Sequence, residues 1–230
     1  MKANVMLIAS HPDDVEIGMG GTTAAMIAEG HNVTLIDLSN GEPTPYGNPE
    51  IRAKESKAAS AILGLKNRIT LDIPNREIFD NIENRKKLAN LMRQHKPDVI
   101  FIPYWDDAHP DHIQACSLAV AARFYSKLVK SDLEHQPHYP KKIFHYFSLH
   151  IKLKISPSFI FDISDYFEKK ISAVQAYRSQ FENNPNNKNF LQLLEKENAY
   201  WGSQIGVKYG EAFACKENLA FKRTADFLDC

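Results

Sequence analysis

Two short segments of this 230-residue chain place histidine and aspartate in the same order. The first reads SHPDD at residues 10–14, and the second reads HPDH at residues 109–112. Imidazole nitrogens and carboxylate oxygens are the ligands that a catalytic zinc ion takes, with one position left for water. Zinc lowers the pKa of that water to about 7, which produces a nucleophile at neutral pH. The two segments therefore predict a hydrolytic metal site.

Three of these side chains form a possible set of metal ligands. His11 and Asp14 come from the first segment, and His112 comes from the second. Together they provide two nitrogens and one carboxylate oxygen, and they leave room for water. The expected cofactor is one Zn²⁺ ion per chain, although such a ligand set would also accept Fe²⁺ or Co²⁺.

Three further side chains of the two segments are predicted to be catalytic. Asp13, next to the ligand Asp14, is free to act as the general base that takes a proton from the attacking water. His109 lies three residues before His112, one turn away if a helix begins there, so it can reach the site without binding the metal. We expect His109 to stabilise an oxyanion or to act as an acid, with Asp111 orienting it.

Glycines after the first segment suggest a different function, dinucleotide binding. An apolar run is followed by Gly18, Gly20 and Gly21. Asp37 lies about 20 residues further on, where a dinucleotide-binding fingerprint has the acidic residue that binds the ribose. That fingerprint needs its first glycine directly at the strand end, where this chain has His-Pro-Asp-Asp. Two carboxylates there would repel a pyrophosphate. We therefore interpret the glycines as positions where the first helix packs closely against the sheet.

Helix capping is a purely structural explanation for the same two segments. Proline in a first helical turn and aspartate near a helix N-terminus are common, and buried histidines often bond to carbonyl groups. A single segment would not separate capping from metal binding. Two segments with the same His-Pro-Asp order, each after a predicted strand, favour the metal site.

The elements that would position these residues alternate between apolar runs and helical patterns. Apolar runs rich in β-branched residues predict strands at 5–10, 32–38, 68–73 and 98–104. Because the runs are continuous, the strands should be buried on both faces, as in a parallel sheet. Helical patterns between them end at Gly30, at Gly64 and before Pro97. This predicts a Rossmann-like α/β fold, a doubly wound and mostly parallel sheet flanked by helices, in which the turns after the first and fourth strands meet if those strands are neighbours.

The second half of the chain is predicted to continue the same single domain, residues 1–230. A helix is expected over 112–129, followed by apolar runs at 143–151 and 158–164 and a last helix through about Gln204. Between them, Asp165 and Glu168 have the spacing of a capping box. The helix that they begin would carry an apolar stripe facing the core. The stripe consists of Phe167, Ile171, Val174, Tyr177 and Phe181.

The composition limits the kinds of binding partner and the cellular compartment that we expect. Lys plus Arg and Asp plus Glu number 28 each, so no net field attracts nucleic acid or an anionic membrane. The N-terminal apolar run is too short for a signal sequence or a membrane span, which leads us to expect a cytoplasmic protein with a small-molecule substrate. Cys116, Cys215 and Cys230 lack the spacing of a disulfide framework or a thiolate zinc site.

The two motifs, SHPDDVEIGMGGT and HPDH, resemble the signature of the LmbE-like, or PIG-L, family of zinc-dependent sugar N-deacetylases. The resemblance continues in NGE at 40–42, IRAKE at 51–55, FDISDYFEKKISAVQAYRSQF at 161–181 and GVKYGEAF at 206–213. The last two segments are most similar to the bacillithiol-pathway branch, whose members deacetylate N-acetylglucosaminyl malate. The resemblance implies a Rossmann-like fold that is often a homo-oligomer, and the metal and catalytic roles assigned above.

The resemblance also implies substrate contacts. Glu42 and Arg52 would contact the sugar or its acidic aglycone, and Lys142 stands where the bacillithiol branch tends to have arginine. Asp107 takes a place that is tyrosine in some members, and His150 is a further residue that could line the cleft. Lysine cannot make the planar two-point contact of arginine with a carboxylate, so the aglycone is left open.

The predicted function is metal-dependent hydrolysis of the acetamide of an N-acetylglucosaminyl conjugate, with N-acetylglucosaminyl malate as the expected substrate. Acetate and the free amino sugar would be the products. One alternative is an N-deacylase of another amino sugar, such as a cell-envelope or antibiotic intermediate. Two alternatives of other classes are a dinucleotide-dependent oxidoreductase and a non-catalytic sugar-binding protein.

Overall fold

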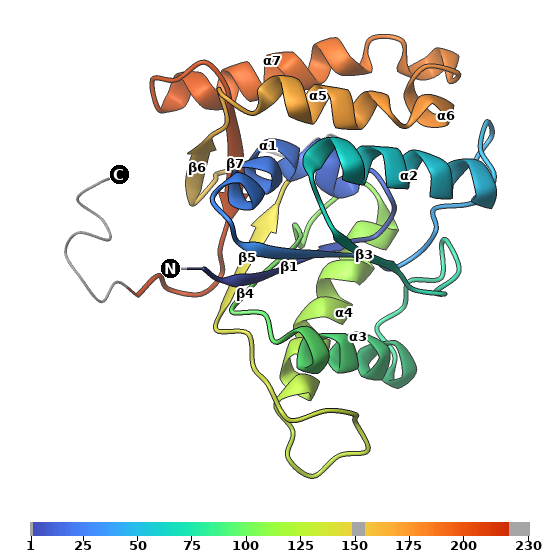
Figure 1. Cartoon of the computed structure of the whole chain (residues 1–230), viewed down its shortest axis with the longest axis vertical. Helices are drawn as coiled ribbons and strands as arrows, with labels where there is room; N and C mark the ends of the chain where they lie inside the picture. The colour runs from blue at the N-terminus through green and yellow to red at the C-terminus, as the bar shows by residue number, and fades with distance from the viewer. Residues whose placement is uncertain (1, 149–154, 221–230) are drawn as a thin grey trace.

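The computed structural model describes residues 2–148 and 155–220 and arranges helices in layers on both sides of one sheet (Figure 1). The strands are β1 (Asn4–Ala9), β2 (Asn32–Asp37), β3 (Asn67–Thr70), β4 (Val99–Pro103), β5 (Lys142–Tyr146), β6 (Phe159–Asp162) and β7 (Gly210–Ala214). Their order in the sheet is β3-β2-β1-β4-β5-β7-β6. The first five strands are parallel, whereas β7 is antiparallel to both β5 and β6. This confirms the predicted doubly wound, mostly parallel sheet.

Helices cover both faces of the sheet. They are α1 (Asp14–Ala28), α2 (Pro49–Leu63), α3 (Ile82–His95), α4 (Pro110–Ser126), α5 (Phe167–Gln175), α6 (Arg178–Phe181) and α7 (Phe190–Gln204), with a 3₁₀ turn η1 (Pro185–Asn187) before α7. Figure 1 shows α1 and α2 on one face and α3 and α4 on the other. Helices α5 and α7 form an outer layer over α1 and α2.

Residues of β1 face the two helical layers alternately. Met6 and Ile8 are fully buried in a cluster with residues of α3 and α4, including Leu88. Leu7 is fully buried in a second cluster with residues of α1, α2 and α5, including Leu63. A strand that must be apolar on both faces reads as a continuous apolar run, which is why the sequence identified it.

Strands β1 and β4 are neighbours, and the strand order reverses between them. β1 pairs with β2 on one side and with β4 on the other, where Leu7 lies opposite Phe101. The turns that follow β1 and β4 therefore emerge side by side at the carboxyl ends of the strands, where ligands of such sheets bind. This predicted adjacency is confirmed, and it brings the two histidine-aspartate segments together.

Some predicted boundaries differ from the structure. Helix α1 begins at Asp14, earlier than the helical pattern of residues 21–30 predicts, and contains a non-helical residue, Met19. The capping box at Asp165 is wrong, because the residue before α5 is Tyr166 and no side chain caps this helix. Strand β7 was not predicted from a sequence pattern. His150, expected as a possible cleft residue, lies outside the described residues.

Close packing explains a glycine of the first motif. A Cβ atom on Gly21 would lie 2.7 Å from Cβ of Ile163, which is fully buried. Helix α1 therefore approaches the segment after β6 more closely than a larger residue would permit. This supports a packing role for the glycine instead of a phosphate loop.

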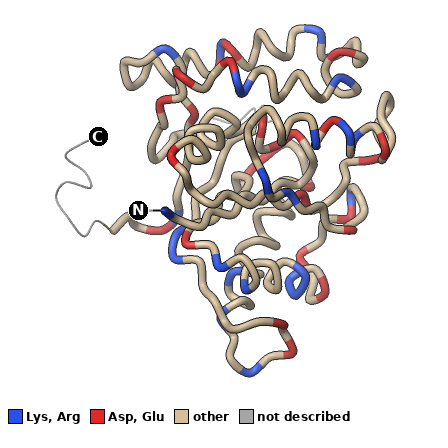
Figure 2. Tube along the Cα trace, in the orientation of Figure 1, with Lys and Arg blue, Asp and Glu red and all other residues tan. Residues whose placement is uncertain are grey.

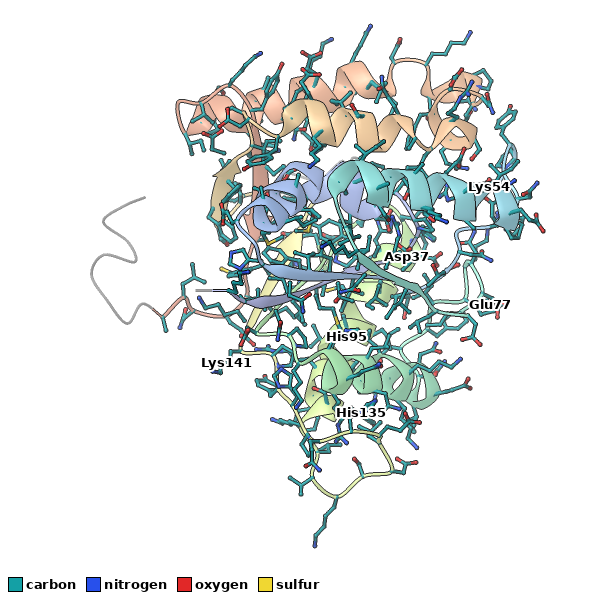
Figure 3. All side chains as sticks on the ribbon, in the orientation of Figure 1. Asp37, Lys54, Glu77, His95, His135 and Lys141 are labelled. Atoms are coloured by element: carbon teal, nitrogen blue, oxygen red, sulfur yellow. The ribbon has the colours of Figure 1, made fainter. Side chains whose placement is uncertain are left out.

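Replacing Gly21 with alanine is expected to lower the free energy of unfolding by about 1–3 kcal/mol, because the added methyl group overpacks the contact with Ile163. Equilibrium denaturation measures the change. Lys54→Ala, at an exposed position of α2 labelled in Figure 3, is the control and should stay within about 0.5 kcal/mol of the unmodified protein. An equally small change in Gly21→Ala would contradict the packing role.

Charges of both signs are interspersed along the chain through all layers (Figure 2). This arrangement agrees with the balanced composition, and the part of the trace that the structure describes has no extended region of a single sign. Among the helices of residues 2–148 and 155–220, none is long and apolar enough to cross a membrane.

Candidate metal centre and catalytic site

His11, Asp14 and His112 come together at the carboxyl ends of β1 and β4. One possible ligand atom from each residue lies within 4.8 Å of the others, and all three residues are buried. Asp14 Oδ1 lies 3.3 Å from His112 Nε2, and Asp14 Oδ2 lies 3.7 Å from His11 Nδ1. Two nitrogens and a carboxylate at these separations fit a divalent transition-metal ion.

Two further carboxylates hold the histidine rings from behind. Asp111 Oδ2 lies 2.9 Å from His11 Nε2, and Asp107 Oδ2 lies 2.9 Å from His112 Nδ1. The other nitrogen of each ring therefore points toward Asp14. Histidine ligands of metals commonly carry such a carboxylate partner, which fixes the tautomer and makes the ligand nitrogen more basic. This pairing is the strongest structural indication that the cluster is a metal site.

The electrostatics of the centre also favour a cation. Burial by itself would lower the pKa of His112, but the charge of Asp14 and the hydrogen bond with Asp107 raise that pKa to about 10. Burial opposes ionisation of Asp14 as well, yet His112 holds the pKa of this carboxyl well below its usual value. The same negative charge that attracts a proton to His112 would attract a divalent cation.

A second group of possible ligands shares one histidine with the first. His11, His109 and Asp111 also place ligand atoms within 4.8 Å of one another. In this group, however, Asp111 is already hydrogen-bonded to His11 and accepts an N–H from Arg76 at 3.1 Å. Since Asp111 supports His11 in this way, and both histidines of the group with Asp14 have such a carboxylate partner, we propose the group that contains Asp14 as the metal ligands.

Asp13 occupies a strained backbone position beside the centre. Its φ angle is 114°, in a region that residues other than glycine rarely adopt, and its side chain makes no capping hydrogen bond to α1. Capping therefore does not explain this residue. Asp13 Oδ2 accepts a hydrogen bond from Arg52 Nη2 at 3.2 Å. Burial raises the pKa of Asp13 to about 7 although Arg52 lowers it, which suits proton transfer at neutral pH.

His109 is held as a neutral ring at the start of α4. It precedes Pro110, and its Nδ1 accepts the backbone N–H of Asp111 at 3.2 Å, so the ring proton of the neutral form lies on Nε2. Burial, followed by the charges of His112 and His11, lowers the pKa of His109 to about 4. These properties favour a neutral hydrogen-bond donor for an oxyanion over an acid. The orienting contact comes from the backbone of Asp111, because its carboxylate is bonded to His11.

A cavity of about 180 Å³ opens beside Asp13 and Asp14. It gives the centre a space in which a substrate can reach both carboxylates. Its remaining lining comes from Ile17, Ser148, Gln180, Phe181, Asn187 and Phe190. Phe181, predicted to be a core residue, is half-buried and lines this cavity while also contacting the core.

Two of the predicted substrate-binding residues lie near the centre but not on this cavity. Arg52 is 4% exposed, contacts Asp13, and lines a neighbouring pocket of about 670 Å³ with Pro12. Glu42 is buried within its own loop, where its carboxylate accepts hydrogen bonds from the backbone N–H and hydroxyl of Thr44. Their predicted contacts with substrate remain predictions.

Lys142 lies at the wrong end of the sheet. It is the exposed first residue of β5 and pairs with Val99, the first residue of β4. In Figure 3 its neighbour Lys141 appears at the side where the parallel strands begin, away from Asp37 at the end of β2. The candidate site lies at the carboxyl ends of the parallel strands, whereas Lys142 lies at the edge where they begin. The prediction that Lys142 contacts a substrate in this site is therefore wrong.

Asp37, the possible ribose-binding acid of the dinucleotide alternative, is engaged inside the protein. Its two carboxylate oxygens accept hydrogen bonds from Arg68 at 2.6 and 2.9 Å, and its side chain is fully buried. A second acid, Glu16, binds the same guanidinium at 2.7 Å. This buried cluster does not present Asp37 to a ligand, so the dinucleotide alternative loses its second feature.

Sequence reasoning left the role of Asp107 open. The structure shows that its carboxylate contacts His112, accepts the hydroxyl hydrogen of Ser148 at 2.6 Å, and accepts the backbone N–H of His109 at 2.8 Å. An aspartate two residues before the second motif was the available signal. Its meaning depends on the turn geometry, which the sequence pattern does not specify.

Replacing Asp107 with asparagine is expected to weaken zinc binding about 10- to 100-fold, because His112 loses the carboxylate that orients it and makes it basic. Titration of the metal-free protein in competition with a chromophoric chelator gives the dissociation constant. Asp106→Asn, at the exposed neighbouring position, is the matched control. Equal zinc affinities for the two variants would contradict this role.

Comparison with known proteins finds a family model that matches the part of the chain that contains this site. A model of the PIG-L family, described as GlcNAc-PI de-N-acetylase, matches residues 6–123, just over half of the chain. The matched region contains every residue assigned above to the metal centre and to catalysis.

Individual proteins match over most of the chain. Diacetylchitobiose deacetylase of Thermococcus kodakarensis is 29% identical, with 90% of this chain and 80% of that protein covered. A probable N-acetyl-α-D-glucosaminyl L-malate deacetylase 2 of Bacillus cereus is 24% identical over 79% of this chain and 86% of that protein. The crystal structure of the conserved protein TT1542 from Thermus thermophilus has a TM-score of 0.88 and 38% identity, with 96% of this chain and 98% of that chain covered.

Proposed function

Because this chain belongs to the PIG-L family, we propose that it is a zinc-dependent hydrolase that removes the acetyl group from an N-acetylglucosamine-type sugar conjugate. One observation carries the proposal: His11, Asp14 and His112 converge next to a cavity, and carboxylates support both histidines. Asp13 lines the same cavity with a pKa of about 7. Such an arrangement suits hydrolysis of an unactivated amide.

The metal, when bound, supplies a Lewis acid that polarises the amide carbonyl and lowers the pKa of water. Asp13 takes the proton of the attacking water, and Arg52 holds the carboxylate in position for this transfer. His109 donates its Nε2–H to the oxyanion that develops on the former carbonyl oxygen. Asp13 then returns the proton to the departing nitrogen, so the amino sugar leaves as a neutral amine.

The finer substrate assignment, N-acetylglucosaminyl malate, rests on two supports. One is the similarity to the probable malate-conjugate deacetylase of Bacillus cereus. The other is Arg52, whose Nε and Nη1 are buried without a hydrogen-bond partner among the described residues. An acidic aglycone that reached this guanidinium would be bound by charge-assisted hydrogen bonds. The similarity to diacetylchitobiose deacetylase supports an uncharged sugar aglycone instead.

Amine release distinguishes these possibilities. The protein is treated with chelator, reloaded with Zn²⁺, and assayed with N-acetylglucosaminyl malate, diacetylchitobiose and free N-acetylglucosamine. We expect release that requires the metal and is fastest with the malate conjugate. Faster release from diacetylchitobiose would support the deacetylase proposal and would replace malate with a sugar as the aglycone. No release from any N-acetyl sugar by the zinc-loaded protein would overturn the proposed function.

A further inference from the structure

The cavity beside the metal centre has a wall that the proposed mechanism does not use. Its residues are Gln180 and Phe181 at the end of α6, Asn187 at the end of η1, and Phe190 at the start of α7. We call these four residues the C-terminal wall. In Figure 1, α6 and the adjoining end of α7 lie beside α2, in the outer helical layer. The wall therefore faces Asp13 and Asp14 from a separate part of the chain.

The C-terminal wall combines aromatic and amide side chains. The rings of Phe181 and Phe190 stack with their centroids 4.4 Å apart and their planes 25° from parallel. Both residues are only half-buried, so part of each ring remains accessible from the cavity. Gln180 and Asn187 line the same cavity and bring amide oxygens next to this apolar surface, because their amide nitrogens donate to Thr44, Ser179 and the backbone.

We propose that the C-terminal wall recognises the sugar ring of the substrate. The ring of one terminal N-acylated amino sugar packs its C–H face against Phe181 and Phe190, and its hydroxyl groups bond to the amides of Gln180 and Asn187. This inference rests on the proposed function, because the metal centre must hold the acyl group for the ring to reach the wall. It assigns substrate specificity to four residues outside the two metal-binding motifs.

The chemistry of the wall favours a sugar over the acyl chain as its occupant. A pyranose has apolar C–H faces and a polar rim, which matches aromatic rings flanked by amides. An acyl chain offers no partner for the amides. The size of the cavity, about 180 Å³, lies below the roughly 300 Å³ at which common ligand pockets begin. It therefore suits one ring, and the aglycone must extend out of the cavity.

Two buried carboxylates hold the wall in place. Glu55 accepts both the backbone N–H and the hydroxyl of Ser179 at 2.7 Å, directly before the wall. Gln180 Nε2 donates to Thr44 Oγ1 at 3.2 Å, and Glu42 in turn holds Thr44. Because these contacts fix Ser179 and the side chain of Gln180, little ordering remains to oppose binding. Glu42, predicted to touch the substrate, acts here as a positioning residue.

Two contacts join the two halves of the wall. Asn187 Nδ2 donates to the backbone carbonyl of Gln180 at 2.9 Å, and the stacked rings of Phe181 and Phe190 lie on the same short connection. The wall thus behaves as one packed surface. Removing one ring should weaken sugar binding without moving the metal ligands, which lie on other elements.

The test separates binding from chemistry by comparing KM with kcat. Phe190→Leu in the zinc-loaded enzyme is expected to raise KM for an N-acetylglucosaminide about tenfold, with kcat and zinc content within twofold of wild type. Phe124→Leu, at a 52% exposed position of α4, is the matched control and should leave KM unchanged. Circular dichroism and the unfolding midpoint verify that both variants are folded.

A paired substrate set tests which part of the substrate the wall contacts. N-acetyl and N-butanoyl glucosamine carry the same ring and different acyl chains, and Phe190→Leu should raise both KM values by the same factor. Unequal factors would overturn the inference, because the wall would then contact the acyl chain. A KM within twofold of wild type for both substrates would also overturn it and would leave the proposed deacetylase intact.

Direct binding keeps the inference testable if the proposed function fails. Saturation-transfer NMR with methyl N-acetylglucosaminide measures affinity without turnover, in the zinc-loaded wild type and in Phe190→Leu. Affinity that falls about tenfold in the variant supports sugar recognition by the wall, whatever the assay of amine release shows. Equal affinities, or no binding by the wild type, would reject the wall as a sugar site.

Discussion

Replacing Asp13 with asparagine is expected to lower kcat for amine release about 100- to 10,000-fold and to leave zinc content per chain unchanged. Asparagine has the same shape and tolerates the positive φ of this position, but it cannot take a proton from water. The proposed metal ligands are other residues, so binding of zinc should persist. Steady-state kinetics with the zinc-loaded variant and metal analysis of the same sample measure both quantities.

Asp106→Asn is the matched control for this experiment, because it makes the same chemical change at an exposed position near the site. Its kcat should equal that of the wild type. If Asp13→Asn retained kcat within threefold of wild type, the general-base assignment would be wrong. Loss of zinc from Asp13→Asn would instead show that this carboxylate contributes to the metal centre itself.

The second large effect is expected for Asp14→Asn, which removes the proposed charged ligand between His11 and His112. Zinc affinity should fall by more than the roughly 10- to 100-fold expected for Asp107→Asn, because Asp14 would touch the ion directly whereas Asp107 acts through a histidine. The neutral amide also removes one negative charge from a buried site. Competition titration with a chelator ranks the two variants under the same conditions.

The relative zinc affinities of Asp14→Asn and Asp107→Asn decide between the two possible groups of metal ligands. A weaker effect in Asp14→Asn than in Asp107→Asn would contradict the choice of ligands. It would favour the other group of possible ligands, in which His109 and Asp111 replace His112 and Asp14. Asp111→Asn then provides the deciding comparison: it should behave like Asp107→Asn if Asp111 only supports His11, and more severely if Asp111 is a ligand.

The parallel half of the sheet was predictable because its strands are buried on both faces. β1 and β2 read as continuous apolar runs, and the helices between strands end at recognisable stop signals, such as Gly64 with a φ of 82°. Strand β7 offered no such signal. Its sequence GEAFA contains a buried glutamate, Glu211, whose carboxylate lies 2.6 Å from the buried ammonium of Lys170. Pairing across the fold, which a local pattern does not record, places these charges inside.

The candidate metal centre was predictable because its residues follow two parallel strands. Side chains that follow neighbouring parallel strands meet at the carboxyl ends of those strands. The two motifs predicted that His11 and His112 would lie together, and the adjacency of β1 and β4 brings them together. Lys142 was misplaced because family resemblance identified a loop without fixing which end of the next strand it joins. The C-terminal wall was missed because Gln180 and Phe190 are ordinary by type, and only the path of the chain from α5 to α7 places them on the cavity.

The cavity is assembled from two stretches of chain that are far apart in sequence, and this separation has a consequence for how the protein can change. The proposed ligands and Asp13 belong to the stretch that the family model matches, whereas Gln180 and Phe190 lie beyond residue 123. Substitutions or length changes between α6 and α7 can alter the accepted sugar while the reacting groups keep their geometry. The connection from Phe181 to Phe190 is accordingly the place where substitutions can change the substrate preference. The groups proposed to hydrolyse the amide would stay unchanged.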